Sequence, residues 1–543
     1  TQSSANRLRE TMHPIGWTSN GVIDKGRENR SARRKQDEEN PMKLKNLTAI
    51  AGLVLLAACG KESTAPAPAA ESEAATARGA PYAVGSTTFF IHDETRAYDN
   101  VNGIDEGIRT LITEIWYPVD HDVAASGDYR RATYGDYVFG DRDVHRLMMT
   151  RTTFFHLTPD TVRDGVSQAE IDAAIEELFN RERGSFVDAP LADTGRPLPV
   201  VVMSHGDAGS RYNMESVVEY LAAHGYFVIA PEHTGNSPYS LTGRDPALRD
   251  DPDFAAKMAG VLPQLSALGA YGKEENYGQS YTPLSEGRGS LEFLQQLDRS
   301  FLQRLNDLRA ALRELDRMNA EGVAGSGPGA LDLDRIGLTG RSFGGATTLV
   351  GLALEPRFTS GFAVVPPGWP DPRPQLPAEA LAGEGSESVL LAADAQCPQT
   401  AIHKPTELRS AADDTQNISL AASGAEAAGV DLPSPGNPHP ILRRSFDETD
   451  APVVWGLLSD SNHATFGVSG GYWWPELKPN TQARHFDPDT MFELADVHEA
   501  HKMQRELALD FFDATIRRDA SAESRLKTNR YERDGLALET RNF

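Results

Sequence analysis

The sequence predicts an α/β fold with a mainly parallel central sheet and helices on both faces. The main observation is that strand-like apolar runs alternate with segments of helical apolar spacing along most of the chain. The run LPVVVMS at 198–204 indicates a buried strand, and YFVIA at 226–230 indicates the next one. The segment FLQRLNDLRAALREL at 301–315 places its apolar residues on one face of a helix.

The remaining elements follow in chain order within a single domain, which we expect to span 81–520. The expected strands and helices are a strand at 111–117 stopped by Pro118, a helix at 216–224, a strand at 334–339, a helix at 344–354, a strand at 453–458 and a helix at 496–518. Two insertions, at about 140–195 and 370–448, interrupt this alternation and are either lids or surface elaborations. Residues 521–543 are expected to be a C-terminal tail.

Composition limits the classes of function. The chain has 543 residues, is 39% hydrophobic and carries a formal net charge of −25. This composition is that of a globular protein, and its acidity argues against nucleic acid or an anionic membrane surface as the main partner. Two cysteines cannot form a disulfide framework, and no Cys/His pattern has the spacing of zinc ligands. A large enzymatic domain is the favoured interpretation.

The N-terminal segment has the organisation of an export signal. Residues 1–41 are polar and without periodicity, and we interpret them as a non-native upstream extension. Met42 opens a signal peptide over 42–58, in which a short basic stretch precedes an apolar run. The sequence Leu56-Ala57-Ala58-Cys59 resembles a bacterial lipobox, which makes Cys59 the predicted lipidation site; a plain secretory signal is the alternative. Residues 59–80 are rich in Ala, Ser, Pro and Glu and predict a flexible tether.

Ser342 is the predicted nucleophile. Residues 340–344 read Gly-Arg-Ser-Phe-Gly, a G-x-S-x-G pattern between a predicted strand and a predicted helix. In such a turn the glycines avoid clashes, the serine hydroxyl is exposed, and the helix N-terminus favours negative charge. The pattern alone is common by chance, but its place between strand and helix makes it specific.

A nucleophilic serine of this kind needs two N–H groups for the oxyanion that develops on the substrate. The backbone N–H groups of Phe343 and Asp207 are the predicted donors, since Ser204-His205-Gly206-Asp207 follows a strand where such hydrolases place their second donor. We interpret His205 as a structural residue that orients this loop.

These motifs carry a family resemblance. The segments RTL…WYP at 109–118, SHGDAG at 204–209, LAAHGYFVIAPEHTGNS at 221–237 and GRSFGGATT at 340–348 resemble the platelet-activating-factor acetylhydrolase and dienelactone-hydrolase-like branch of the α/β-hydrolases. The resemblance covers roughly 81–365 and resumes at 450–518. It implies an α/β-hydrolase fold and esterase chemistry by a Ser-His-acid triad, with no metal and no organic cofactor. The family commonly has His before its nucleophile, where this chain has Arg341.

Two histidines compete for the role of base. The base is expected late in the chain, and Asn462-His463-Ala464-Thr465-Phe466-Gly467 resembles the segment that holds the triad histidine in this family. His463 is therefore the preferred base. In the competing interpretation, the run at 452–458 is the penultimate strand and Asp460 after it is the acid, and His485, after a further short strand, is the base.

The acid is the least determined member of the triad. Asp460 is the preferred candidate across both interpretations, with Asp394, Glu426 and Asp371 as alternatives if His463 is the base. The position that aligns with the acetylhydrolase acid is Val365, so direct transfer from the family fails there. We interpret the acidic pairs near 413–414 as solvated surface.

Other side chains receive simpler interpretations. His498 and His501 are expected to be solvated on the last helix, and the aromatic run Tyr472-Trp473-Trp474 is either core packing or the wall of an acyl pocket.

The expected function is that of an exported serine carboxylesterase, held by a lipid anchor in the outer membrane or at the surface of a Gram-negative bacterium. Its expected partner is an ester substrate, including hydrophobic lipids or aliphatic polyesters, with membrane contact only through the N-terminal anchor and no nucleic acid. The alternatives are a phospholipase, acetylhydrolase-like or lactone hydrolase, and, from another class, a non-catalytic envelope binding lipoprotein.

Overall fold

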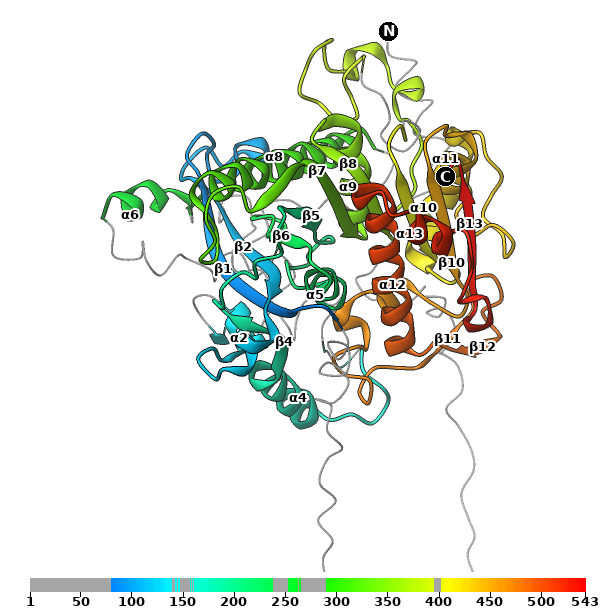
Figure 1. The fold of residues 1–543 in the computed structure, drawn as a ribbon. Helices are drawn as coiled ribbons and strands as arrows, with labels where there is room; N and C mark the ends of the chain where they lie inside the picture. The colour runs from blue at the N-terminus through cyan, green and yellow to red at the C-terminus, as the bar shows by residue number, and fades with distance from the viewer. Residues whose placement is uncertain are drawn as a thin grey trace, which may run out of the picture. The chain divides into compact units, whose positions relative to one another are not determined.

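The chain is built around one large sheet. The computed structural model describes residues 80–138, 161–237, 290–394 and 402–543, together with the shorter stretches 142–143, 145–146, 157, 159, 252–261 and 263–264. In these residues, eleven strands form a sheet in the order β13-β10-β9-β8-β7-β5-β6-β2-β1-β4-β3 (Figure 1). The strands are β1 (Ala83–Asp93), β2 (Arg109–Val119), β3 (Arg131–Thr133), β4 (Glu182–Val187), β5 (Leu198–Ser204), β6 (Phe227–Pro231), β7 (Leu331–Arg341), β8 (Phe358–Val364), β9 (Thr406–Ala411), β10 (Val453–Leu458) and β13 (Leu536–Arg541). A separate pair is formed by β11 (Thr481–Ala483) and β12 (Met491–Glu493).

The central strands run in one direction and the outer strands do not. Each neighbouring pair from β6 through β5, β7, β8 and β9 to β10 is parallel, whereas β2 is antiparallel to both β6 and β1, and β13 is antiparallel to β10. The expectation of a mainly parallel sheet of the α/β-hydrolase type is confirmed. Because the central strands are parallel, their carboxyl ends lie at one edge of the sheet, where loops from distant parts of the sequence meet.

Helices cover both faces of the sheet. They are α2 (His121–Ala125), α4 (Gln168–Asn180), α5 (Glu215–Ala223), α6 (Pro252–Met258), α8 (Leu291–Glu321), α9 (Phe343–Leu354), α10 (Thr415–Ala428), α11 (Pro440–Glu448), α12 (Val497–Phe512) and α13 (Ala520–Leu526). Helices α5 and α12 lie side by side over one face (Figure 1), and α8 packs against the other.

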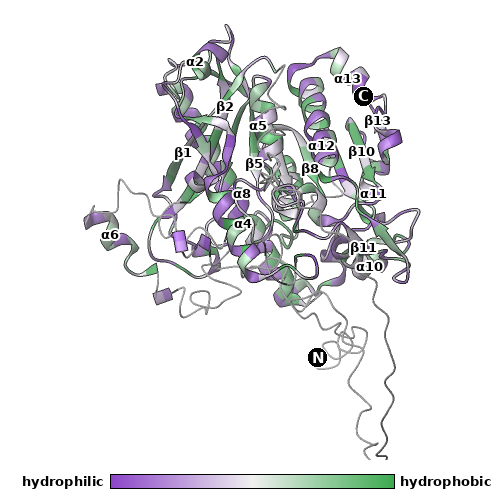
Figure 2. Ribbon diagram, turned by 90° about the horizontal axis from the view of Figure 1, so that it is seen from below, coloured by the Kyte–Doolittle hydropathy of each residue, from purple (hydrophilic) through white to green (hydrophobic). Residues whose placement is uncertain are grey.

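The alternation of side chains along β5 shows why the sheet needs two layers of helices. Val201 and Met203 pack with residues of α5 and α12, while Val200 and Val202 pack with residues of α8. All four side chains are fully buried. Figure 2 shows the consequence, since the hydrophobic colour follows inner strands such as β5 and β8, whereas α12, with one face on the core, carries both colours.

The structure differs from the sequence-based prediction in two parts of the domain, the insertions and the C-terminal tail. The insertion at 370–448 contains β9, a strand in the middle of the sheet, and the insertion at 140–195 contains β4. The expected tail at 521–543 instead forms most of α13 and contributes β13, which pairs with β10 at the edge of the sheet. The sequence did not indicate β9 because its segment, TELRSA, carries a glutamate and an arginine among only a few apolar residues.

The predicted export signal lies outside the described residues. The upstream extension 1–41, the signal peptide 42–58, Cys59 and all of the tether but residue 80 lie outside the described residues. Within the described part, no helix is both long and apolar enough to cross a membrane.

Candidate active site

Ser342 occupies a strained turn between β7 and α9. Its backbone has φ 58° and ψ −124°, a conformation that L-residues rarely adopt, and its N–H donates to Val364 O at 2.8 Å. A side chain at Gly344 would collide with Ser204 O, and one at Gly340 would collide with the backbone of Gly344. The two glycines of the motif are therefore required by the close approach of β5, as the sequence pattern predicted.

His463 lies beside the serine. It begins η5 (His463–Phe466), the short 3₁₀ turn that follows β10, and its Nε2 is 2.8 Å from Ser342 Oγ. The Asn462 side chain caps this turn by accepting from the N–H groups of Ala464 and Thr465. The cap holds the loop in place, and the imidazole is within hydrogen-bond reach of the serine hydroxyl.

Asp414 supplies the carboxylate next to the histidine. Its Oδ2 is 2.7 Å from His463 Nδ1, and its Oδ1 accepts from Asn417 N–H as the N-cap of α10. The residue is completely buried. Burial raises the pKa of Asp414, but the charge of His463 and its hydrogen bond outweigh that effect, so the pKa lies below its usual value. A buried, ionised carboxylate fixes His463 with Nδ1–H as donor and Nε2 facing the serine.

The structure thus corrects the expected acid. The carboxylate of Asp460 accepts from Arg484 rather than from His463, and its backbone has φ 51°. The pair at 413–414 is not solvated surface either, because Asp413 is 5% exposed and Asp414 is 0% exposed. Asp414 follows β9, the strand that the sequence did not indicate, and this is why it was overlooked.

The alternative residues also lie elsewhere. Asp371 pairs with Arg373, Asp394 accepts from Gly385 N–H, and Glu426 lies near the end of α10. The backbone N–H of His485 donates to Asp413 Oδ1 at 3.2 Å. Of the two histidines that the sequence proposed as base, the one that the structure brings to Ser342 is His463.

Val365, the position that aligns with the family's acid, follows β8. Its carbonyl accepts from the Asn417 side chain. The carboxylate in this chain therefore comes from the loop after β9, one strand further along the sheet.

Arg341 takes the place of the family's histidine and supports the base. Its guanidinium is fully buried and donates to His463 O and, at 3.4 Å, to Asn213 Oδ1. Burial lowers the pKa of Arg341 to about 9, although the charge of Asp414 opposes this shift. An arginine retains its proton at neutral pH, so Arg341 places a positive charge behind the Ser-His-Asp array and ties the His463 backbone to β7.

The two residues predicted to supply oxyanion donors both belong to segments next to Ser342. Phe343 is the first residue of α9, where backbone N–H groups are not used within the helix. Asp207 follows Gly206, and a side chain on Gly206 would lie 3.2 Å from Ser342 Cβ. The loop after β5 thus runs directly along the nucleophile.

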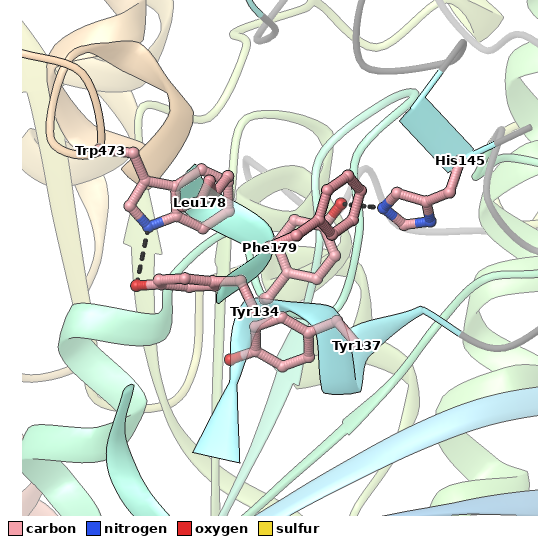
Figure 3. Close-up of a pocket in the computed structure, with 7 residues that line it drawn as sticks. Tyr134, Tyr137, His145, Leu178, Phe179 and Trp473 are labelled. Carbon is pink, nitrogen blue, oxygen red and sulfur yellow. Dashed lines mark hydrogen bonds between the residues drawn. The ribbon is translucent and has the colours of Figure 1, made fainter. Parts of the chain in front are cut away.

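Aromatic side chains enclose a small cavity beside Trp473. Figure 3 shows its lining of Tyr134, Tyr137, His145, Leu178, Phe179, Tyr212 and Trp473. The Trp473 indole N–H donates to Tyr134 Oη at 3.0 Å, and the ring centroids of Tyr137 and Tyr212 are 4.7 Å apart. The cavity beside Trp473 is only about 10 Å³, which is room for about one water molecule, and its lining side chains are buried. The structure therefore shows Trp473 as core packing and shows no acyl pocket at this place.

His501 corrects another expectation. It is 0% exposed rather than solvated, and its Nδ1 lies 2.6 Å from Ser216 Oγ. In the described residues, no group of three or more His, Cys, Asp and Glu side chains could hold a metal ion.

Comparisons with known proteins agree with the motifs. The family model described as platelet-activating factor acetylhydrolase, isoform II, matches residues 171–258. The platelet-activating factor acetylhydrolase of Cavia porcellus is 27% identical over 174 residues, which are 32% of this chain and 36% of that protein. The chain thus spans about a third of the length of this relative. These matches confirm the resemblance to platelet-activating factor acetylhydrolases, within the α/β-hydrolase superfamily.

A solved structure of a ferulic acid esterase from Streptomyces cinnamoneus is also similar. Its TM-score is 0.49 at 17% identity, and the alignment covers 85% of this chain and 97% of that one.

Proposed function

We propose that this relative of the platelet-activating factor acetylhydrolases is a serine carboxylesterase. The observation that carries the proposal is the continuous hydrogen-bonded array from Ser342 Oγ through His463 to Asp414, built at the carboxyl ends of three strands. The family matches support ester hydrolysis in general, and the array supplies a mechanism for it.

In this mechanism, Ser342 Oγ attacks the ester carbonyl while His463 Nε2 accepts its proton. Asp414 stabilises the imidazolium that forms, and the N–H groups of Phe343 and Asp207 bind the oxyanion of the tetrahedral intermediate. His463 then protonates the departing alcohol, which leaves an acyl group on Ser342. A water molecule, deprotonated by His463, releases the acid and restores the serine.

The substrate class is a hydrophobic ester. Support comes from the predicted export signal, since an enzyme outside the cytoplasm meets lipids and polyesters that do not enter cells. An acetylhydrolase or phospholipase activity is the second candidate, favoured by the family model that matches 171–258.

The first experiment measures turnover of p-nitrophenyl esters of increasing acyl length by the purified protein, with Ser342→Ala as the control. We expect turnover by the wild type, none above background by the variant, and labelling of Ser342 by a fluorophosphonate in the wild type alone. Equal turnover by both proteins would remove Ser342 as nucleophile. A wild type that neither turns over esters nor takes the label would instead indicate the non-catalytic binding lipoprotein.

We also propose that the protein is exported and lipid-anchored through Cys59, on the basis of the lipobox-like sequence at 56–59. In a Gram-negative host, the wild type should fractionate with membranes and Cys59→Ser should move to the soluble fraction. Equal membrane association of both would rule out this anchor.

A further inference from the structure

The loop that carries the Asp207 donor is held from behind by a buried arginine of α8. Arg304 Nη1 donates to His205 O at 2.6 Å, and its Nη2 donates to Gly206 O at 3.0 Å. The residue is 0% exposed. A guanidinium donates in a rigid fork, so it fixes both carbonyls of this short segment at once.

The peptide bond between Gly206 and Asp207 connects the contacts of Arg304 with the direction of the Asp207 N–H. The described chain contains no cis peptide bond, so Gly206 C=O and Asp207 N–H point in opposite directions. Because Gly206 O faces Arg304 on α8, the N–H of Asp207 faces away from α8. Gly206 itself lies against Ser342. Arg304 therefore sets the direction of the proposed oxyanion donor.

Two further donors reach the same carbonyl. Gly209 N–H donates to Gly206 O at 3.2 Å, and His205 Nδ1 lies 2.7 Å from it. His205 Nε2 accepts from His233 N–H at 2.9 Å, which leaves the ring proton on Nδ1 as the donor to Gly206. Burial and the charge of Arg304 hold the pKa of His205 well below its usual value, so the ring stays neutral in this tautomer.

The same arginine also contacts the other side of the oxyanion site. Its guanidinium carbon lies 4.8 Å from the ring centroid of Phe343, whose N–H is the first proposed donor. Asn236 accepts from Arg304 and donates to Asp207 Oδ1 at 2.7 Å. Arg304 is thus linked to both residues that supply an oxyanion donor.

A second buried array holds the support in place. Ser204 Oγ lies 2.8 Å from His233 Nε2, and His233 Nδ1 lies 3.0 Å from Asp307 Oδ2, on α8 one turn after Arg304. Arg109 donates to both oxygens of Asp307. These residues are all 0% exposed. The array fixes His233, whose backbone N–H in turn fixes His205.

We propose that Arg304 is a positioning residue of the esterase, which orients and polarises the Gly206–Asp207 peptide so that Asp207 N–H binds the oxyanion. A cation on the carbonyl side strengthens the N–H of the same peptide as a donor, because linked hydrogen bonds polarise one another. The effect is realised when negative charge develops on the substrate oxygen, so it acts on the transition state more than on substrate binding. The inference rests on the proposed function.

The test compares Arg304→Met, which keeps the aliphatic stem and removes the charge, with Arg304→Lys, which keeps the charge but loses the fork. Arg313→Met is the matched control on the same helix, since Arg313 is 56% exposed and pairs with Asp93. We measure kcat and KM on a p-nitrophenyl ester, the inhibition constant of a trifluoromethyl ketone, which forms an oxyanion on Ser342, and the Tm of each protein.

We expect kcat to fall roughly 100-fold in Arg304→Met and roughly tenfold in Arg304→Lys, with KM within threefold of wild type, since removal of a whole oxyanion donor costs about 10² to 10³ in kcat. Ketone affinity should fall in proportion to kcat/KM, and Arg313→Met should match wild type. The pH dependence of kcat/KM should be unchanged, since Arg304 acts through the oxyanion loop.

Three results would overturn the inference: a folded Arg304→Met with kcat within threefold of wild type, a rise in KM at constant kcat, or a loss of kcat without loss of ketone affinity. If Arg304→Met does not fold, the same three criteria are applied to Arg304→Lys, provided that its Tm equals that of the wild type. A wild type without ester turnover defeats the proposed function itself, whereas an active wild type with an equally active Arg304→Met defeats only the role of Arg304.

Discussion

Two Ser-His-Asp arrays lie within this one domain, and their hydrogen bonds are nearly the same. In the candidate active site, the distances from Ser342 to His463 and from His463 to Asp414 are 2.8 and 2.7 Å. In the second array, which joins Ser204, His233 and Asp307, they are 2.8 and 3.0 Å. Connectivity alone therefore does not separate a catalytic site from a structural one.

The surroundings separate them. Ser342 and His463 retain 3% and 8% exposure at a strained turn, whereas every member of the second array is 0% exposed and Ser204 ends a regular strand. Burial and the charge of Arg304 lower the pKa of His233 to about 4, so it is a poor base at neutral pH. Access, a strained turn and the adjacent proposed oxyanion donors distinguish the first array, whereas the second array is fully buried.

We expect the largest difference in kcat between alanine variants of the two serines, Ser342 and Ser204. Ser342→Ala should lower kcat on p-nitrophenyl esters by on the order of 10⁵-fold or more, because it removes the nucleophile. Ser204→Ala removes a buried hydroxyl behind the oxyanion loop and should lower kcat by less than about tenfold, with a loss of about 1 to 2 kcal/mol in the free energy of unfolding. Kinetics and urea unfolding of both variants check this. A Ser204→Ala protein as inactive as Ser342→Ala, at wild-type stability, would make the second array part of the chemistry.

A smaller effect should separate the two aspartates that compete as triad acid. Asp414→Asn should lower kcat by roughly 10³- to 10⁴-fold, because an amide favours the wrong tautomer of His463. Asp460→Asn, which alters only the contact with Arg484, should stay within about threefold of wild type. Steady-state kinetics with matched Tm values distinguish them. The opposite ranking would return the role of acid to Asp460.

The sequence predicted those features that rest on local patterns. The strands at 198–204 and 226–230 are continuous apolar runs, and the turn at Ser342 has a strong glycine signature, so both were placed within a residue or two. His463 was found by its local motif after an apolar strand. The resemblance to the acetylhydrolases indicated the same chemistry but could not supply the acid, since Val365 stands at that position.

What the sequence did not predict depends on buried polar groups. Strand β9 contains Glu407 and Arg409, which form a buried ion pair at 3.0 Å and make the segment look solvated. Asp414 follows this strand, so it was missed with it. The sequence did contain a signal, because Asp is a favoured N-cap residue directly before a helix. Asp414 stands in that position before α10, and its side chain accepts from Asn417 N–H. Likewise, the partners of Arg304 come from three loops that approach one another only in the folded chain.

The smallest effect concerns the pH dependence of stability. His233 in the folded protein has a pKa of about 4, against about 6.5 in the unfolded chain, so protons bind the unfolded state first as the pH falls. The stabilisation from neutral His233 is complete above pH 6.5 and is lost between about pH 6.5 and 4. At pH 5 this loss amounts to about 2 kcal/mol.

Urea unfolding of the wild type and His233→Gln at pH 8, 7, 6 and 5 tests this directly. The variant starts from a lower free energy of unfolding, because Gln cannot bridge Ser204 and Asp307 as the imidazole does. Its decline between pH 7 and 5 should nevertheless be shallower than that of the wild type by about 2 kcal/mol. The interval from pH 8 to 7 is the internal control, since the pKa of His233 lies below it in both states and the two curves should run parallel there. Parallel curves down to pH 5 would mean that His233 has the same pKa in the folded and the unfolded chain. Burial would then not distinguish the second array from the array at Ser342.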